Sequence, residues 1–337
     1  MKNIFIGLIF LFFSSISYAQ VNLTPLISAG VEDTQRFAES FLNPGLDAVA
    51  FSLSNGWYNS GKAKGLGRFE IAFIGNVSFV SSSQQSFELN TADYNFLQFQ
   101  DGSTVKNVGN ILGQNDPGIT ALAVFQDGNG NEQSVSFALP QGLARSGVNF
   151  VPTGMIQASV GLIGGIELKG RYLPEVDTDD GAAKFYGIGI QNEFTDWIPG
   201  GKLLPVHISG AVSYSNFQGN LVLSETPLVS GSNQRIDSRM DAWAFDAIVS
   251  TKLPVINFYA GLGYVKASSR FSMLGEFIID EGIDQGQTIV DPFSTSSSVT
   301  GFRGTLGTKL TLGFFRLFAD YSIQEFNTLS VGLAFGI

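Results

Sequence analysis

Large apolar residues alternate with small or polar residues along most of this 337-residue chain. The C-terminal segment shows the pattern most clearly, because Leu329, Val331, Leu333 and Phe335 alternate with serine, glycine and alanine. A period of two places alternate side chains on opposite faces of a β-strand. One face of this strand is therefore bulky and apolar, and the other is small or polar.

The same alternation predicts about eleven strands along the chain. Besides the last one, they lie near residues 49–57, 69–79, 155–162, 166–172, 186–194, 206–214, 243–253, 258–264, 302–312 and 317–323. The long stretch 80–152 is irregular and predicts either an inserted unit or extra hairpins, one of them pairing 119–125 with 134–139. Single-chain bacterial barrels have even strand numbers, so we expect about 12 to 14 strands in all.

The choice between a soluble sandwich and a membrane barrel depends on the face that is not apolar. A sandwich exposes mainly Lys, Thr and Glu there, whereas this chain carries mainly Gly, Ala and Ser with scattered charges. Short links at 163–165, 254–255 and 313–314 alternate with long polar links at 174–183, 218–241 and 267–298. Membrane barrels join short periplasmic turns to long outer loops. We therefore predict an all-β fold, a transmembrane antiparallel barrel with its C-terminus in the periplasm.

Composition supports this class. Charged residues make up 14% of the chain, against roughly 25% in soluble proteins, and there are 40 Gly and 30 Phe. The net charge of −10 argues against nucleic acid as a partner, because phosphate binding needs a basic surface. The absence of Cys excludes disulfides and thiol chemistry. Membrane lipid is the partner that the pattern implies.

The first 19 residues have the form of a secretory signal peptide. Lys2 precedes an apolar run over residues 4–13, and Ser17-Tyr18-Ala19 forms a small-x-small cleavage site. The run is shorter than the ~20 residues that a membrane-spanning helix needs. We predict cleavage before Gln20, export across the inner membrane and final localisation in the outer membrane.

Residues 20–45 are predicted to form an N-terminal hatch segment, and residues 46–337 the barrel. Within the hatch, 32–42 has the spacing of a helix. Asn43-Pro44-Gly45 is predicted to end it. Such a helix can plug the barrel, pack under its periplasmic mouth, or simply fray.

A helix, then Asn43-Pro44-Gly45, then a first strand resembles the start of the FadL/OmpP1/TodX-type barrels. That resemblance implies an N-terminal hatch and carriage of hydrophobic compounds across the outer membrane. The whole chain resembles the DUF6588-type outer-membrane barrels of Bacteroidota, whose function is unknown. Its last strand, Leu329 to Ile337, resembles the C-terminal signal of outer-membrane barrels, which implies the barrel-assembly machinery as a partner.

Few residues suggest chemistry. His207 is the only histidine, and a catalytic role would need Ser209 and Asp246 on the same face. The alternative is an ordinary polar residue in the lumen. Residues 127–132 carry oxygen ligands at alternate positions, as a Ca²⁺ loop does, but Glu132 stands where that loop has glycine. A glycine-rich hairpin turn is the alternative there. We expect no cofactor, no metal and no enzymatic activity.

Strand register also predicts which polar side chains face the lumen. They are expected to line or block a pore, or to satisfy one another in a sealed barrel. These residues are Glu70, Glu193, His207, Asp246, Lys252, Arg303, Lys309 and Asp320. A second set of aromatic residues is expected in the interfacial girdles, namely Trp57, Tyr58, Trp197, Tyr214, Trp243, Tyr264 and Tyr321.

Three functional hypotheses remain open at this point. The first is a channel or transporter for hydrophobic small molecules. The second is a non-transporting structural or assembly barrel whose outer loops bind partners. The third is a barrel hydrolase that depends on His207. A lumen packed shut by large side chains would argue against passage.

Overall fold

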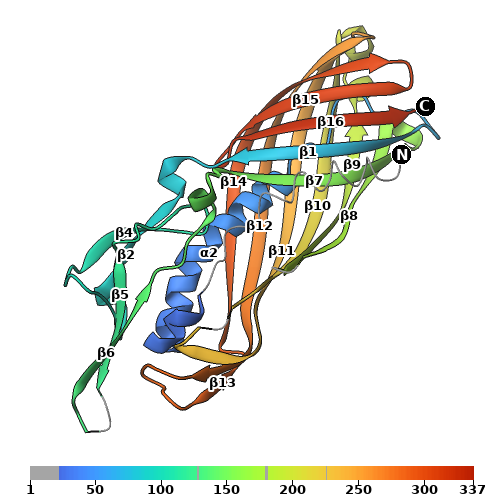
Figure 1. Cartoon of the computed structure of the whole chain (residues 1–337). Helices are drawn as coiled ribbons and strands as arrows, with labels where there is room; N and C mark the ends of the chain where they lie inside the picture. Colours follow the sequence, from blue (N-terminus) through green and yellow to red (C-terminus); the bar gives the residue numbers. More distant parts are fainter. Residues whose placement is uncertain (1–22, 127–128, 179–180, 225) are drawn as a thin grey trace.

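The computed structural model describes residues 23–337 except 127–128, 179–180 and 225 (Figure 1). The predicted signal peptide lies outside the described residues, as does part of the glycine-rich turn at 127–131. The described chain begins with a short 3-10 helix, η1 (Thr24–Ala29), and a long helix, α2 (Val31–Leu53). The helix is followed by an irregular segment with turns and bends, and then by the strands.

Strands from both ends of the sequence close into one antiparallel barrel. Its wall runs in the order β11-β10-β9-β8-β7-β1-β16-β15-β14-β12, and pairing of β12 with β11 closes the ring. These strands are β1 (Phe69–Phe79), β7 (Phe150–Gly161), β8 (Ile166–Thr178), β9 (Gly181–Glu193), β10 (Val206–Val222), β11 (Val229–Thr251), β12 (Ile256–Ile279), β14 (Phe293–Leu312), β15 (Phe315–Ile323) and β16 (Thr328–Gly336). The predicted all-β antiparallel barrel is confirmed.

The barrel has ten strands, so the expected 12 to 14 was wrong. The described residues of the segment 80–149 add no strand to the wall and form two small sheets beside it. One pairs β2 (Ser86–Asn90) with β4 (Val105–Gly109), and the other holds β3 (Leu97–Phe99), β5 (Thr120–Gln126) and β6 (Glu132–Ala138). The β5–β6 pair is the predicted hairpin.

Strand lengths divide the molecule into a barrel and an outer part. β1, β15 and β16 have 11, 9 and 9 residues, which suffices to cross the hydrocarbon of a bilayer. β11, β12 and β14 have 23, 24 and 20 residues and continue past one end of the barrel (Figure 1). There β12 pairs with the short strand β13 (Thr288–Val290), and the extended strands form a curved wall.

Against this wall pack η1, the first half of α2 and residues 80–149, and we call this outer part the head. One continuous apolar core joins its pieces. Phe37 and Phe41 of α2 belong to that core. So do Leu97 and Phe99 of β3 and Phe277 of β12. The turns at the opposite end, which also holds the C-terminus, include the short links 162–165, 252–255 and 313–314. Because short turns and the C-terminus usually lie on the periplasmic side of such barrels, we call this end the periplasmic end and the opposite end the outer end.

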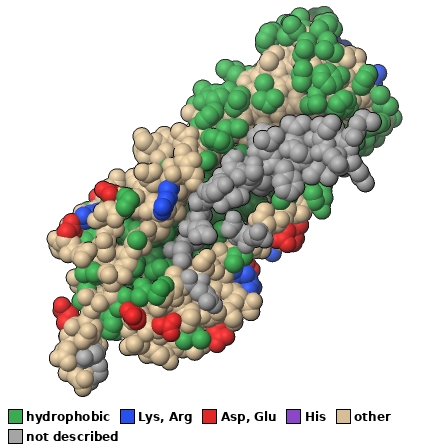
Figure 2. All heavy atoms as spheres, viewed as in Figure 1, with side chains coloured by type: hydrophobic (Ala, Val, Ile, Leu, Met, Phe, Trp, Pro, Cys, Tyr) green, Lys and Arg blue, Asp and Glu red, His purple; other side chains and the backbone are tan. Residues whose placement is uncertain are grey.

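The outer surface of the barrel is apolar. Large exposed side chains such as Ile188, Phe258, Phe302 and Leu306 cover it, whereas the head carries most of the charges in view (Figure 2). Aromatic residues mark the outer limit of this belt. We call Tyr172, Tyr186, Tyr214, Trp243 and Tyr264 the outer girdle.

Two members of the predicted girdle set lie elsewhere. Trp57 and Tyr58 are 1% and 5% exposed and belong to the interior, so this prediction was wrong for them. Trp197 lies exposed in the periplasmic link between β9 and β10, and Tyr321 lies exposed on β15. No described helix is both long enough and apolar enough to cross a bilayer.

Helix α2 continues through Asn43-Pro44-Gly45 and ends at Leu53, which contradicts the predicted stop. Proline inside a helix costs about 3 kcal/mol. Phe37, Phe41 and Phe51 offset this cost, because they share one face at helical spacing and are fully buried. The strand predicted at 49–57 is therefore wrong as well. The motif that resembled the FadL-type hatch does not precede a strand here.

Candidate functional site

The N-terminal segment runs through the barrel. The second half of α2 contacts β1, β7, β11, β12 and β14 from inside. Residues 54–68, which we call the lumen segment, continue to the periplasmic end. Along this path the Gly61 amide donates to Ser250 Oγ, and the Gly67 amide donates to the Gly161 carbonyl. Helix and lumen segment together form the plug.

Buried cations of the wall hold the end of α2. Arg171 of β8 donates to the carbonyls of Leu53 and Asn55 at 3.1 and 2.8 Å. Arg303 of β14 donates to the carbonyl of Ser54. The last carbonyls of a helix lack intrahelical partners, and the helix dipole makes them favourable sites for positive charge. These contacts fix the plug through its backbone.

Different groups stabilise the buried positive charges of the two arginines. Arg303 forms a bidentate pair with Asp246, with nitrogen–oxygen distances of 3.0 and 2.6 Å. Arg171 instead donates to Gln157 and stacks over the Trp57 ring at 3.9 Å. Such a cation–π contact is worth up to about 2 kcal/mol when desolvated.

Lys169 adds a third cation by donating to the Trp57 carbonyl at 2.8 Å. We call Lys169, Arg171 and Arg303 the clamp.

A second polar layer lies at the periplasmic end. Lys64 of the lumen segment lies 2.7 Å from Glu167 and 3.3 Å from Glu70. Glu70 also pairs with Arg316 at 3.0 Å. These ion pairs join the lumen segment to β8, β1 and β15.

The structure brings most of the predicted lumen residues inside. Glu70, Asp246, Arg303 and Asp320 are buried there, and Glu193, His207 and Lys309 are half-buried near the periplasmic end. Lys252 is the exception. It follows the end of β11 and is exposed in the turn, so its predicted lumen position was wrong. The alternation on which that prediction rested stops at Thr251, where the strand ends.

The histidine does not meet the partners that hydrolysis would need. His207 Nδ1 lies 2.6 Å from Glu193, whereas Asp246 pairs with Arg303. Ser209 accepts a hydrogen bond from Gln191. Within the described residues no group of three His, Asp or Glu side chains is placed to hold a metal ion.

An apolar cavity of about 310 Å³ lies between α2 and the barrel wall, towards the head. Among the described residues, no charged side chain lines it. Its apolar lining includes Leu46, Val49 and Leu53 from the helix and Val151, Leu173, Phe185, Phe217 and Ile236 from the wall. This cavity was not predicted from the sequence.

The wall beside the cavity is unpaired. Pairing of β7 with β8 stops at Ile156 and Tyr172, and the described residues beyond pair only with β1 and β9, respectively. Pro152 and Pro174 explain the gap, because proline cannot donate to a strand ladder and so favours an edge. Two prolines in consecutive strands were the sequence signal for it.

The gap begins at the outer girdle, where Tyr172 is the last paired residue of β8. Phe150, Pro152 and Gly154 on one edge and Leu173 on the other belong to the cavity lining. The lining of the cavity therefore includes residues from the unpaired edges of both strands, next to the outer girdle.

Several solved barrels resemble this fold at low similarity. Ail, the attachment invasion locus protein of Yersinia pestis, is 11% identical, with 81% of this chain and 99% of that chain covered and a TM-score of 0.27. The translocator domain of autotransporter NalP from Neisseria meningitidis is 10% identical, with coverages of 90% and 96% and a TM-score of 0.31. The outer membrane channel DcaP of Acinetobacter baumannii is 8% identical, with coverages of 80% and 96% and a TM-score of 0.19.

The register of the ten strands, rather than these similarities, establishes the barrel. No curated protein matches the sequence. Residues 1–337 match a family of unknown function along their whole length, and the chain therefore belongs to the DUF6588 family.

Proposed function

We propose that this protein is an outer-membrane barrel that binds a hydrophobic small molecule beside helix α2. The ligand enters from the outer leaflet through the gap between β7 and β8. The observation that carries the proposal is the meeting of an uncharged, apolar cavity with a break in the hydrogen-bonded wall at the level of the outer girdle.

Cavity size and chemistry define the class of ligand. Ligand pockets in proteins measure roughly 300–1,000 Å³, and the 310 Å³ cavity lies at the small end of this range. A lining without charged groups disfavours an ionic ligand, because such a charge would lose its hydration without gaining a partner. A short alkyl chain or a small ring system fits these limits.

Transfer onward to the periplasm requires movement of the plug. Below the cavity the clamp holds α2, and the Lys64 ion pairs hold the lumen segment in the next layer. Lateral entry therefore precedes any passage through the lumen. Binding and transfer are separate steps with separate tests.

Photolabelling tests the binding step. The barrel in phospholipid vesicles is exposed to an alkyl diazirine probe, and labelled peptides are mapped by mass spectrometry. We expect labelling of α2 around Val49, reduced by excess unlabelled alkane and abolished by Val49→Trp, which fills the cavity. Leu306→Trp on the lipid-facing surface is the matched control and should leave the α2 label unchanged. Labelling confined to the apolar belt would refute the proposal.

A non-transporting barrel is the second candidate, and the buried clamp favours it. Three cations bound to the plug backbone hold the plug in the lumen in this conformation. Planar-bilayer recordings distinguish the two candidates. Ligand-dependent conductance or vesicle uptake would support transfer, whereas a permanently silent barrel that still binds alkane would support storage or a structural role.

A further inference from the structure

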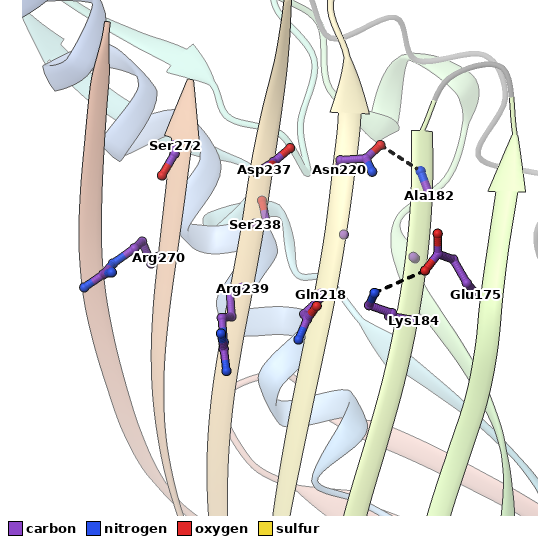
Figure 3. A pocket seen from close by; sticks show the side chains of 12 residues that line it. Glu175, Ala182, Lys184, Gln218, Asn220, Asp237, Ser238, Arg239, Arg270 and Ser272 are labelled. Atoms are coloured by element: carbon purple, nitrogen blue, oxygen red, sulfur yellow. Dashed lines mark hydrogen bonds and ion pairs between the residues drawn. The ribbon is translucent and has the colours of Figure 1, made fainter. Parts of the chain in front are cut away.

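Three cations and one glutamine form a single register row across four neighbouring strands, on the outward face above the apolar belt. Lys184 of β9 lies opposite Gln218 of β10, Gln218 lies opposite Arg239 of β11, and Arg239 lies opposite Arg270 of β12. Figure 3 shows these side chains side by side, around a depression of about 350 Å³ on this face. We call Lys184, Arg239 and Arg270 the cation row.

The positive charges of the cation row are only partly balanced by carboxylates. Like charges directly opposite each other on paired strands are destabilising, and Arg239 faces Arg270 in this way. Arg270 forms no ion pair or side-chain hydrogen bond with any described residue. Arg239 reaches Asp241 only at 3.8 Å, with 59% of its side chain exposed.

Among the residues that the structure describes, the carboxylates nearby are already engaged. Glu175 pairs with Lys184 at 3.2 Å, and Asp237 pairs with Arg235 at 3.0 Å. Asp241 accepts hydrogen bonds from Tyr214 and Asn216. An external anion would therefore relieve the repulsion between the two arginines.

The height of the row identifies the kind of anion. Measured outward along β9, Lys184 lies two residues from Tyr186 of the outer girdle. Arg239 lies four residues from Trp243 along β11, and Arg270 lies six residues from Tyr264 along β12. With about 3.3 Å per residue and a strand tilt near 40°, they stand about 5, 10 and 15 Å above it. The headgroup layer of a phospholipid leaflet is only about 5–8 Å deep. Only the first cation lies within such a layer.

We infer that the cation row binds a phosphorylated glycolipid of the outer leaflet, whose tall headgroup presents anions at several heights. The charge of the whole chain, −10, makes this local run of cations unusual and argues that it serves a specific contact. The inference rests on the outer-membrane placement in the proposed function, but it does not need the apolar cavity.

Native mass spectrometry of the full-length mature barrel tests the inference. The probe is a rough-type lipopolysaccharide with a short phosphorylated sugar core, and the comparators are its dephosphorylated form, phosphatidylglycerol and inorganic phosphate. Each cation near an anionic lipid surface contributes about fivefold in affinity. We expect Arg239→Gln/Arg270→Gln to bind the phosphorylated glycolipid roughly 25-fold more weakly, and Arg239→Lys/Arg270→Lys to retain most of the binding.

Arg145→Gln/Lys202→Gln removes the same charge from exposed sites in the head and at the periplasmic end, and should bind like the wild type. Equal binding by the glutamine variant, or equal binding of dephosphorylated glycolipid, would overturn the inference. So would equal binding of phosphatidylglycerol or free phosphate, because neither spans the row. Wild-type protein that fails to insert into vesicles would refute the membrane placement itself.

Discussion

The pair formed by Arg303 and Asp246 allows the plug to be tested by a single buried substitution. Both side chains are 1% exposed, and Arg303 also donates to the Ser54 carbonyl at the end of α2. Arg303→Met leaves Asp246 buried without its partner, which costs about 3–5 kcal/mol. Asp246→Asn/Arg303→Met removes the whole pair and loses mainly the charged hydrogen bond to the helix, worth about 1.5–3 kcal/mol.

Urea unfolding in phospholipid vesicles measures both costs, with heat-modifiable gel migration as the test of folding. We expect the single variant to be the less stable of the two and to show raised ionic conductance, because the plug end is no longer held. Arg36→Met, on the exposed face of α2, is the matched control and should change stability by less than about 1 kcal/mol. A single variant as stable as the wild type, or a double variant no better than the single one, would refute the clamp.

Three further substitutions test how the plug and the head are built. Gly301→Ala should lower the free energy of unfolding in urea by about 1–3 kcal/mol, because the new methyl group would lie 2.7 Å from the buried ring of Phe51 in α2. The control Gly304→Ala, on the same strand, meets open space and should leave stability unchanged. Burial, followed by repulsion from the carboxylate of Glu325, raises the pKa of Asp47 to about 6. The folded state therefore holds the proton of Asp47 more tightly than the unfolded state. This contribution to stability is present at low pH and is lost as pH rises from about 4 to 6. Asp47→Asn should flatten this dependence and add about 1 kcal/mol at pH 7 after solvent screening, and an unchanged pH profile would contradict it. Asp33→Asn should weaken the hydrogen bonds that its carboxylate accepts from the backbone amides of residues 95–97, and should speed proteolysis of the head. The control Glu32→Gln should not change the proteolysis rate. Equal proteolysis rates for the two variants would exclude Asp33 as an anchor of the head.

Strand alternation was sufficient to predict a barrel, because each wall residue faces either lipid or lumen and a period of two follows from that geometry. It placed Glu70, Asp246, Arg303 and Asp320 on the inner face. It could not pair them, because partners such as Asp246 and Arg303 are 57 residues apart in sequence. Pairing depends on the shear of the closed sheet, which no local pattern contains.

The same local reading failed at the plug. Val49, Phe51 and Leu53 alternate like a strand, and Pro44 reads as a helix stop, yet all four lie in α2. A surface helix is recognised in a sequence by a polar face that recurs every 3.6 residues. The end of α2 is surrounded by the barrel wall, so it has no such polar face and its sequence can alternate like a strand. Contacts with the barrel wall and the head decided the outcome.

By itself, therefore, the sequence determined the apolar outer surface, the inward set of small and polar residues and the positions of the short turns, because each is a property of neighbouring residues. Only the tertiary structure decided that ten strands close the wall, that the described part of 80–149 joins the head, and that the second half of α2 packs inside the barrel. The gap at Pro152 and Pro174 shows the difference most directly. Each proline marks an edge, but two edges form an entrance only where the fold sets them beside an apolar cavity.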